Sequence, residues 1–374
     1  MPRNRFHCLL MPLALVAALL GACTQSTNAQ EDGAGPPAKS AAEPPQQSES
    51  DDEQLTATEA VFPADTESPF ISAGFSGSDL QSEMEFNRAA PALSQPDSTS
   101  NSYPREFDSE APLSRFRQGC FQGAAVSTGF INDGTDGGMG VTSTDLSASF
   151  AIPLGSFDNV VVATPFLRTD FLTAAPALDL PEELYETGAR FFWKRPLNDE
   201  LSVMTIVTPA IRSDFENTSN AFRVFGLGLL IWQAVPETLS LSGGVVHTGR
   251  DDFPILPAAG LLWTPTREWK VDIQFPSPRV SFRIDKDGSH SESWIYLSGV
   301  FGGNTWSVQR ASGVADELTL RDYRLLAGFE HLLPDNRSIF VEGGFVFGRA
   351  VEYESEPEST ELDSTGILRC GIAF

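Results

Sequence analysis

The feature that most constrains the fold is a series of alternating segments from about residue 118 onward. Runs of roughly ten residues alternate apolar and polar side chains and are separated by turn residues. Successive side chains of a strand point to opposite faces, so each run has one apolar and one polar face. About fourteen runs are present, within a range of about 12–16 that their soft boundaries allow. They lie near 119–130, 141–152, 159–171, 183–194, 201–213, 221–232, 238–247, 256–263, 269–275, 279–285, 293–307, 319–331, 338–353 and 365–374.

This pattern predicts an all-β protein, namely a closed antiparallel transmembrane β-barrel whose wall separates hydrocarbon from a wet lumen. A soluble β-sandwich shows the same alternation and remains the alternative. The connections favour the barrel. Compact turns such as RPLNDE and LPDNRS alternate with longer, more polar loops such as ESEPESTELDST, and Pro276-Ser277-Pro278 is a short exception. Four tryptophans at matching strand ends also predict an aromatic girdle at a membrane surface, namely Trp193, Trp232, Trp263 and Trp269.

The last run predicts one face carrying Leu368, Cys370, Ile372 and Phe374, and an opposite face carrying Arg369. A final strand that ends on an aromatic residue resembles the terminal signal of bacterial outer-membrane barrels. Phe374 is therefore the candidate assembly signal, and the barrel-insertion machinery and outer-membrane lipid are the expected partners. In the preceding run, simple alternation predicts Val351 on the apolar face and Glu352 on the polar face.

The N-terminal residues 1–29 predict a signal peptide, with Arg3 and Arg5 before an apolar stretch that is short for a membrane helix. The sequence Leu-Gly-Ala-Cys ending at Cys23 resembles a lipobox, which would make Cys23 a lipidated residue. Ordinary cleavage after Ala29 is the alternative, and both export the chain.

Residues 30–115 predict a disordered acidic linker, because Ser, Pro, Gln, Asp and Glu dominate and no periodic apolar pattern is present. The apolar stretch 70–75, Phe-Ile-Ser-Ala-Gly-Phe, either docks on a partner or on the barrel, or is a sticky spot within the linker. The barrel domain is expected to span 116–374.

Charge and cysteine content exclude several functions. The net charge of −25 argues against nucleic-acid binding, which needs clusters of Lys and Arg. Beyond the export signal only Cys120 and Cys370 remain, and neither belongs to a CxxC or Cys/His cluster, so no metal site and no cofactor are expected. The first and last strands of a closed barrel are neighbours. A Cys120–Cys370 disulfide across that seam is therefore one hypothesis, and two unpaired thiols are the other.

From Leu239 to Glu330 the chain resembles an outer-membrane-type β-barrel family, a domain of unknown function of planctomycete-like bacteria. The resemblance rests on SGGVVHTGRDDFPILPAAGLLWTP, FPSPRVSFRI, FGGNTWSV and RDYRLLAGFEHL. It implies a barrel in an outer membrane and assigns no ligand.

Charged residues fall out of phase with the apolar set, so they are expected to line the lumen. The functional interpretation is a selectivity region, and the structural one is a salt-bridge network that fills the lumen. The candidate residues are Asp272, Arg279, Arg283, Asp322, Arg324, Glu330, Glu342 and Arg369.

His247 with Arg250, Asp251 and Asp252 forms a candidate outer-loop cluster. A histidine near carboxylates can act as a general base, but GxSxG and HExxH are absent, so loop bracing is favoured and no catalytic residue is expected.

The sequence therefore predicts a passive pore or small-solute channel in the outer membrane of a Gram-negative-type bacterium, without enzymatic activity. A structural or interaction barrel with a filled lumen and functional outer loops is the alternative. A barrel-embedded hydrolase is the third and weakest hypothesis.

Overall fold

The computed structural model describes residues 113, 115, 117, 119–134, 138–155, 159–249, 254–274, 277–356 and 358–374. The predicted signal peptide, Cys23, most of the predicted linker with residues 70–75, and Arg250, Asp251 and Asp252 lie outside these residues. Within the described part the only helix is the short 3-10 turn η1 (Pro176–Leu178), and no helix there is long and apolar enough to cross a membrane.

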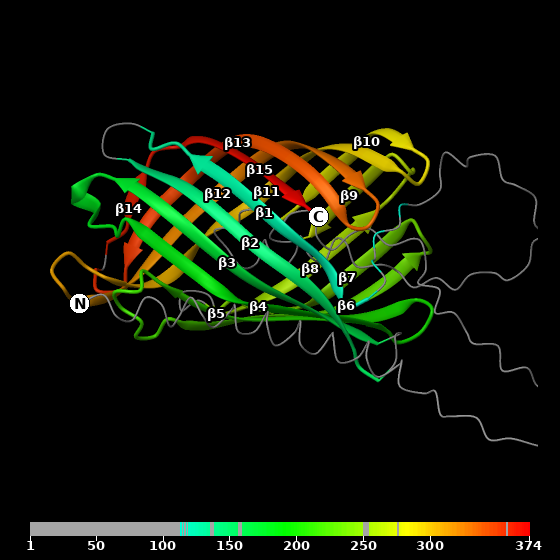
Figure 1. Cartoon of the computed structure of the whole chain (residues 1–374), viewed down its shortest axis with the longest axis horizontal. Coiled ribbons are helices and arrows are strands. Elements are labelled where there is room, and N and C mark those ends of the chain that lie inside the picture. The colour runs from blue at the N-terminus through cyan, green and yellow to red at the C-terminus, as the bar shows by residue number, and fades with distance from the viewer. Residues whose placement is uncertain are drawn as a thin grey trace, which may run out of the picture.

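The described chain folds into a closed antiparallel β-barrel (Figure 1). The strands are β1 (Phe121–Ile131), β2 (Met139–Pro153), β3 (Val160–Ala174), β4 (Glu183–Pro196), β5 (Leu201–Ser213), β6 (Phe222–Val235), β7 (Leu239–His247), β8 (Ile255–Trp263), β9 (Trp269–Gln274), β10 (Arg279–Asp287), β11 (Ser291–Gln309), β12 (Ala315–Leu333), β13 (Arg337–Tyr353), β14 (Thr360–Leu362) and β15 (Thr365–Ala373).

Closure of the barrel comes from pairing of the first strand with the last. β1 pairs with β15 from Ala125↔Ala373 to Ile131↔Ile367, and β15 pairs on its other side with β13. The short β14 pairs only with β13, so 14 strands make the ring. The predicted barrel and strand number are confirmed. A closed ring leaves no unpaired edge, which any sheet within a bilayer requires.

Side chains alternate across the wall as the sequence predicts. Leu368, Cys370 and Ile372 face outward, whereas Arg369 is 1% exposed and faces the lumen. Every strand of the ring carries at least one exposed large apolar side chain. One example per strand is Phe130, Leu146, Phe171, Phe191, Val207, Leu230, Val245, Ile255, Ile273, Ile284, Ile295, Leu325, Ile339 and Leu368. Trp232, Trp263 and Trp269 of the predicted girdle are also exposed.

The prediction for the end of β13 is wrong. Val351 is buried on the lumen side, and Glu352 lies on the other face, where Arg321 Nη2 is 3.0 Å from its Oε1. The cause is an irregular register between β12 and β13 at Arg321 and Tyr323, opposite Gly348, which has a φ of 57°. A bulge adds one residue to a strand and so reverses the faces beyond it.

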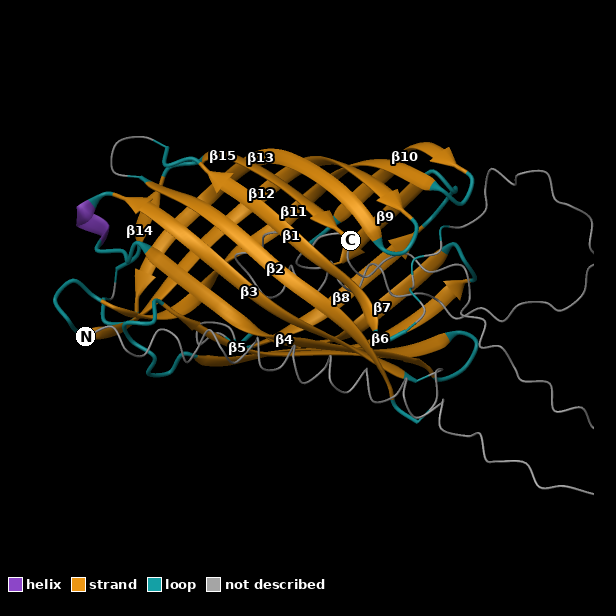
Figure 2. Cartoon of the chain, viewed as in Figure 1, coloured by secondary structure: helices purple, strands orange, loops and turns teal. Residues whose placement is uncertain are grey.

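The two ends of the barrel differ. At the termini end, where β1 begins and β15 finishes, the connections are short turns such as 197–200, 236–238 and 334–336. At the loop end the connections include the longer 175–182, 214–221 and 354–364, whereas 275–278 and 310–314 are short. This difference is typical of outer-membrane barrels. Strands β7 to β10 are shorter than β11 to β13, so the wall is lower on that side (Figure 2). Strands β6 to β10 are called the panel below.

A direct contact between β5 and β11 crosses the lumen at the loop end. The two strands run in the same direction, and Ser307 pairs in parallel with Ser213. The loop after β5 strengthens the contact, because Gln309 N donates to Asp214 Oδ2 at 2.7 Å and Asn217 Nδ2 donates to Ser307 Oγ at 2.8 Å. This contact is called the bridge. It closes a smaller circuit of nine strands, namely β11, β12, β13, β15 and β1 to β5, and the panel lies outside this circuit.

Two large apolar clusters line the lumen. The loop-end core joins both walls of the smaller circuit and contains Ile131, Met139, Val141, Leu172, Leu184, Val300, Trp306, Val308, Leu318, Leu320, Leu326, Val346, Val351, Tyr353 and Ile367. The panel strip lies on neighbouring strands from β3 to β8 and contains Val162, Phe192, Met204, Ile206, Phe225, Leu227, Leu229, Val246 and Ala258. A barrel of about eight strands is just filled by its own side chains, so a nine-stranded circuit can be packed shut.

Candidate functional site

Six of the predicted lumen residues form three ion pairs on the inner face of the wall. Arg324 Nε lies 2.6 Å from Asp322 Oδ1, Arg369 Nη1 lies 2.6 Å from Glu342 Oε1, and Arg279 Nη2 lies 2.9 Å from Glu330 Oε2. All six side chains are buried. A charge that is removed from water needs a partner of opposite charge and further hydrogen bonds to be tolerated. The structure brings these six residues together on the inner face, where they neutralise one another in pairs.

Tyr296 of β11 connects two of these pairs. Its hydroxyl donates to Glu342 Oε2 at 2.5 Å, and the Arg279 guanidinium lies 3.7 Å from the centroid of its ring. The ring covers Gly328 of β12, where an added Cβ would lie 2.3 Å from Tyr296 Cζ. Only glycine at that position allows the ring to lie flat between the two ion pairs.

One polar contact also crosses the lumen of the smaller circuit, and two ion pairs lie beside it. Asn304 Nδ2 of β11 donates to Glu186 Oε2 of β4 at 3.4 Å, and Arg212 Nε of β5 lies 3.1 Å from Glu186 Oε1. On β3, Arg168 Nη2 donates to Asp170 Oδ1 at 3.0 Å. The Asn304–Glu186 hydrogen bond connects opposite walls of the smaller circuit, whereas the other two contacts pair charges between β4 and β5 and within β3.

The other predicted residues are more scattered. Asp272 is buried and pairs in register with Arg279, and the Arg283 guanidinium lies 6.0 Å from the Trp294 ring centroid. His247 is exposed, and its Nδ1 lies 3.0 Å from the carbonyl oxygen of Val224. Among the described residues no group of three His, Cys, Asp or Glu side chains is placed to hold a metal ion. Phe374 exchanges two backbone hydrogen bonds with Ala124 of β1.

The hypothesis of a Cys120–Cys370 disulfide is wrong. Cys370 is a free, exposed thiol on the outer face, and it lies opposite Thr128 of β1. Cys120 precedes Thr128 by eight residues, which corresponds to about 26 Å along a strand. Neighbouring strands were predicted correctly, but the register places the two cysteines far beyond the roughly 7 Å that a disulfide can bridge.

Two residues before β1 lie inside the barrel at the termini end. Leu113 is buried in a small cluster with the lumen-facing side chains Trp294 and Leu332. Arg115 is also buried, and its Nη1 donates to the carbonyl oxygen of Leu333 at 3.1 Å. Both belong to the part of the sequence that was predicted as linker.

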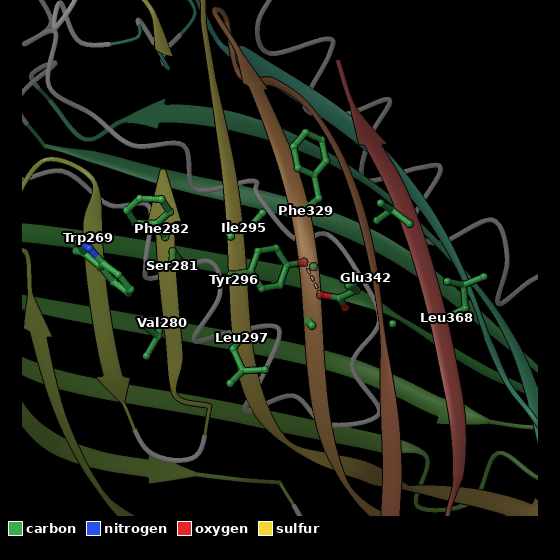
Figure 3. A pocket seen from close by; sticks show the side chains of 14 residues that line it. Trp269, Val280, Ser281, Phe282, Ile295, Tyr296, Leu297, Phe329, Glu342 and Leu368 are labelled. Carbon is green, nitrogen blue, oxygen red and sulfur yellow. Dashed lines mark hydrogen bonds between the residues drawn. The ribbon is translucent and has the colours of Figure 1, made fainter. Parts of the chain in front are cut away.

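A shallow apolar groove of about 650 Å³ lies on the outer face over β9 to β13 and β15 (Figure 3). Large side chains such as Phe282, Leu297 and Phe329 stand around it, and the lining includes Gly328 and Gly343, where the wall carries no side chain. Tyr296 and Glu342 lie behind this thin part of the wall. The groove therefore ends at the ion pairs of the lumen.

Arg310, in the loop between β11 and β12, joins three carboxylates at the loop end. It lies 2.6 Å from Asp179 Oδ2, 3.2 Å from Asp316 Oδ2 and 2.8 Å from Glu356 Oε1. Its guanidinium also lies 3.7 Å from the ring centroid of Tyr353, whose hydroxyl donates to the carbonyl oxygen of Asp179 at 2.7 Å. These contacts, called the Arg310 latch, hold loops from three hairpins together above the loop-end core.

Comparison with known families assigns the chain. The family described as Domain of unknown function (DUF6268) matches residues 174–361, about half of the chain. The chain belongs to this family. The expected relation to a domain of unknown function is thereby confirmed, whereas the match does not show a planctomycete-like source.

Solved structures resemble the DUF6268 barrel only distantly. A mutant of the TodX monoaromatic hydrocarbon channel is 10% identical, with a TM-score of 0.35, and the match covers 67% of this chain and 88% of that one. An outer-membrane channel from Pseudomonas putida F1 is 14% identical, with a TM-score of 0.36 and coverages of 72% and 99%. The β domain of the Bordetella autotransporter BrkA is 9% identical, with a TM-score of 0.29 and coverages of 67% and 98%. A search of curated proteins found no match.

Removal of the latch in this DUF6268 barrel is expected to loosen the loops without unfolding the wall. Arg310→Ala removes three ion pairs, to the exposed Glu356, to the partly exposed Asp179 and to the buried Asp316, so the loss is at least the roughly 0.2–1 kcal/mol of one exposed pair. If the free energy of loop opening falls by about 1 kcal/mol, the open population rises roughly fivefold, and the loops are cleaved roughly fivefold faster in limited proteolysis. Arg321→Ala, which removes one exposed pair with Glu352, is the matched control. Equal cleavage rates for the two variants would contradict the latch.

Acid is expected to loosen the same loops. Hydrogen bonding from Arg310 lowers the pKa of Asp179 below its ordinary value. A carboxyl with a lowered pKa in the folded state stabilises it above the ordinary pKa, and this contribution is lost as the pH falls through the lowered value. Loop cleavage by an acid-active protease should therefore rise below about pH 4 in the native chain and change less in Arg310→Ala.

Sequence reasoning missed two sets of residues in the DUF6268 barrel. The panel strip was missed because only outward apolar residues were sought, yet β6 reads FGLGLLIW and is apolar on both faces. A run without alternation is the signal for a strand that is buried on both sides. Arg310, Asp179 and Asp214 lie in loops, where no periodic signal exists.

Proposed function

We propose that the chain is an outer-membrane barrel that forms a channel for small solutes, with passage only on the panel side of the lumen. The membrane location is supported by the exposed apolar side chain on every strand of the ring and by the tryptophans at the termini end. A soluble barrel rarely exposes a continuous apolar belt. The proposal includes no enzymatic step.

The observation that carries the proposal is the bridge between β5 and β11. It reduces the loop end to a nine-stranded circuit, whose interior the loop-end core fills. Trp306 and Val308 in this core are 2% and 0% exposed, and they join side chains of both walls of the circuit, which supports a packed interior there. At the termini end the ring keeps all its strands. Any continuous route through the barrel must therefore pass beside the panel.

The panel side of the lumen has two chemically different walls. The panel strip supplies apolar side chains on β3 to β8, and the buried charges Asp272, Arg279 and Glu330 lie on β9, β10 and β12. Such a route suits small solutes that combine an apolar body with a polar group. The apolar body can contact the panel strip while the polar group contacts the charged side chains.

Single-channel recording tests both the channel and its path. Ala258→Trp places a large side chain in the lumen from β8, whereas the matched Ala259→Trp places it on the outer face. Conductance steps in the native chain and in Ala259→Trp, with a reduction of at least about half in Ala258→Trp, are expected because the added indole occupies the narrow side. Equal conductance in both variants would mean that solutes pass elsewhere.

A structural or interaction barrel with a filled lumen is the second candidate. The paired charges, the contacts across the lumen and the Arg310 latch favour it, because each holds the lumen or the loops closed. A barrel that inserts into bilayers and never conducts would support this function instead of the channel.

A further inference from the structure

Arg115 enters the lumen at the termini end with its guanidinium only partly bonded. Its Nη1 donates to the carbonyl oxygen of Leu333, whereas Nε and Nη2 are buried and have no hydrogen-bond partner in the described part of the chain. These two nitrogens form the edge of a guanidinium that binds a carboxylate or a phosphate group through two parallel hydrogen bonds. Buried polar groups are nearly always hydrogen-bonded, so an unfilled edge of this kind indicates a ligand with two oxygen acceptors.

The carboxylates around Arg115 do not supply these acceptors. Glu330 and Glu292 attract Arg115 electrostatically, but no carboxylate of the described residues forms an ion pair with it. Glu330 is held by Arg279, whose Nη2 lies 2.9 Å from its Oε2, and Glu292 forms an ion pair with Lys286. Glu330 Oε1 has no hydrogen-bond partner in this part of the structure either, but Arg279 already compensates the charge of that carboxylate. Among the described residues, Arg115 is therefore a buried positive charge without a countercharge of its own.

The lumen around Arg115 is positively charged although the chain as a whole is acidic. The chain has 50 Asp and Glu residues and only 25 Lys and Arg residues. Between the termini end and the Arg279–Glu330 pair, the lumen-facing side chains of β9 to β12 and of Arg115 reverse that balance. The basic side chains are Arg115, Lys270, Arg279, Arg283 and Lys286, and the acidic side chains are Asp272, Glu292 and Glu330. A positive region inside a low-dielectric wall concentrates anions and repels cations.

We propose that Arg115 binds the carboxylate or phosphate group of a small organic anion with an apolar body. The apolar body packs against the cluster of Leu113, Trp294 and Leu332. This cluster lies beside the guanidinium, because Leu113 precedes Arg115 by two residues and Leu332 precedes its hydrogen-bond acceptor Leu333. The inference rests on the proposed channel for the route by which the anion reaches the site. It narrows the solutes of that channel to small amphiphilic anions.

Isothermal titration calorimetry of the full-length barrel in detergent tests the site without requiring conduction. Hexanoate and hexyl phosphate are the anionic probes, and hexanamide and hexylamine present the same apolar body without a negative charge. Arg115→Gln removes both the charge and the paired donors, whereas Arg115→Lys keeps the charge and loses the paired donors. Arg117→Gln is the matched control, because Arg117 Nε donates to the carbonyl oxygen of Asp335 in the turn at the rim. Heat-modifiable gel migration verifies that each variant is folded, and empty micelles give the background.

The native chain and Arg117→Gln are expected to bind at least one of the two anions about tenfold or more tightly than hexanamide, and hexylamine least. Arg115→Gln should lose at least about tenfold in anion affinity with unchanged hexanamide affinity, and Arg115→Lys should lie between, because paired charge-assisted hydrogen bonds are the stronger ones. The anion that binds more tightly identifies the oxyanion.

The site is overturned if the folded native barrel binds neither anion more tightly than hexanamide, or if Arg115→Gln leaves anion affinity unchanged. The calorimetric result is independent of single-channel recording. Anion binding that depends on Arg115 in a barrel that never conducts would support the site and contradict the channel, whereas conduction without anion binding would contradict the site alone.

Discussion

Replacing Arg369 with methionine is expected to destabilise the barrel by about 3–5 kcal/mol, because the change leaves Glu342 as a buried carboxylate without its positive partner. Arg369 Nη1 lies 2.6 Å from Glu342 Oε1, and the two side chains are 1% and 5% exposed. The low-dielectric interior that strengthens the pair also makes an isolated charge there costly. Urea titration in detergent or in vesicles, followed by tryptophan fluorescence and gel migration, measures the loss.

Two further variants separate the ion pair from general disturbance of β15. Arg369→Met combined with Glu342→Gln removes both charges and should recover most of the lost free energy, since a neutral pair carries no isolated charge. Cys370→Ala changes the next residue on the outer face and should stay within about 0.5 kcal/mol of the native chain. If Arg369→Met unfolds at the same urea concentration as the native chain, the lumen around β15 is hydrated and the pair does not brace it.

The second large effect is expected for Gly344→Ala on β13. A Cβ at Gly344 would lie 1.9 Å from the carbonyl oxygen of Leu325 and 3.0 Å from Leu326 Cα, both in the backbone of β12. Backbone atoms within a sheet cannot move aside as a flexible side chain can. Overpacking of this kind costs about 1–3 kcal/mol, and it should also slow assembly of the β12–β13 pair.

The neighbouring glycine provides a matched control. A Cβ at Gly343 would meet nothing closer than 3.4 Å, so Gly343→Ala should be neutral or slightly stabilising. The two variants have the same composition and differ only in which face of β13 carries the methyl group. Comparable yields of heat-modifiable barrel and comparable urea midpoints for both would contradict the close approach of β12 and β13.

Strand positions and the outer face could be predicted because period-two alternation reports them directly. The alternation failed where geometry changes without a change in composition. The bulge at Gly348 reverses the faces of Val351 and Glu352. The sequence contains many glycines, so a single one does not predict a bulge. The register that separates Cys120 from Cys370 depends on how β1 pairs with β15 when the ring closes. The sequence of either strand alone does not determine this register.

The candidate site was predictable only in part for a similar reason. Alternation placed Arg279, Glu330 and Arg369 in the lumen, but their pairing depends on which strands are neighbours and at what height. The bridge depends on β5 and the loop after it meeting β11 across the lumen, between residues more than 80 positions apart in sequence. A contact of that kind leaves no local pattern.

The bridge also bears on how barrels of this kind can change in size. The smaller circuit has its own packed core, and the contact between β5 and β11 closes it. The panel is a row of hairpins inserted between these two strands. Loss or duplication of one hairpin there would preserve the direction of every other strand, the bridge and the core. Related barrels should therefore differ in circumference by steps of two strands, with the variation confined to this side of the ring.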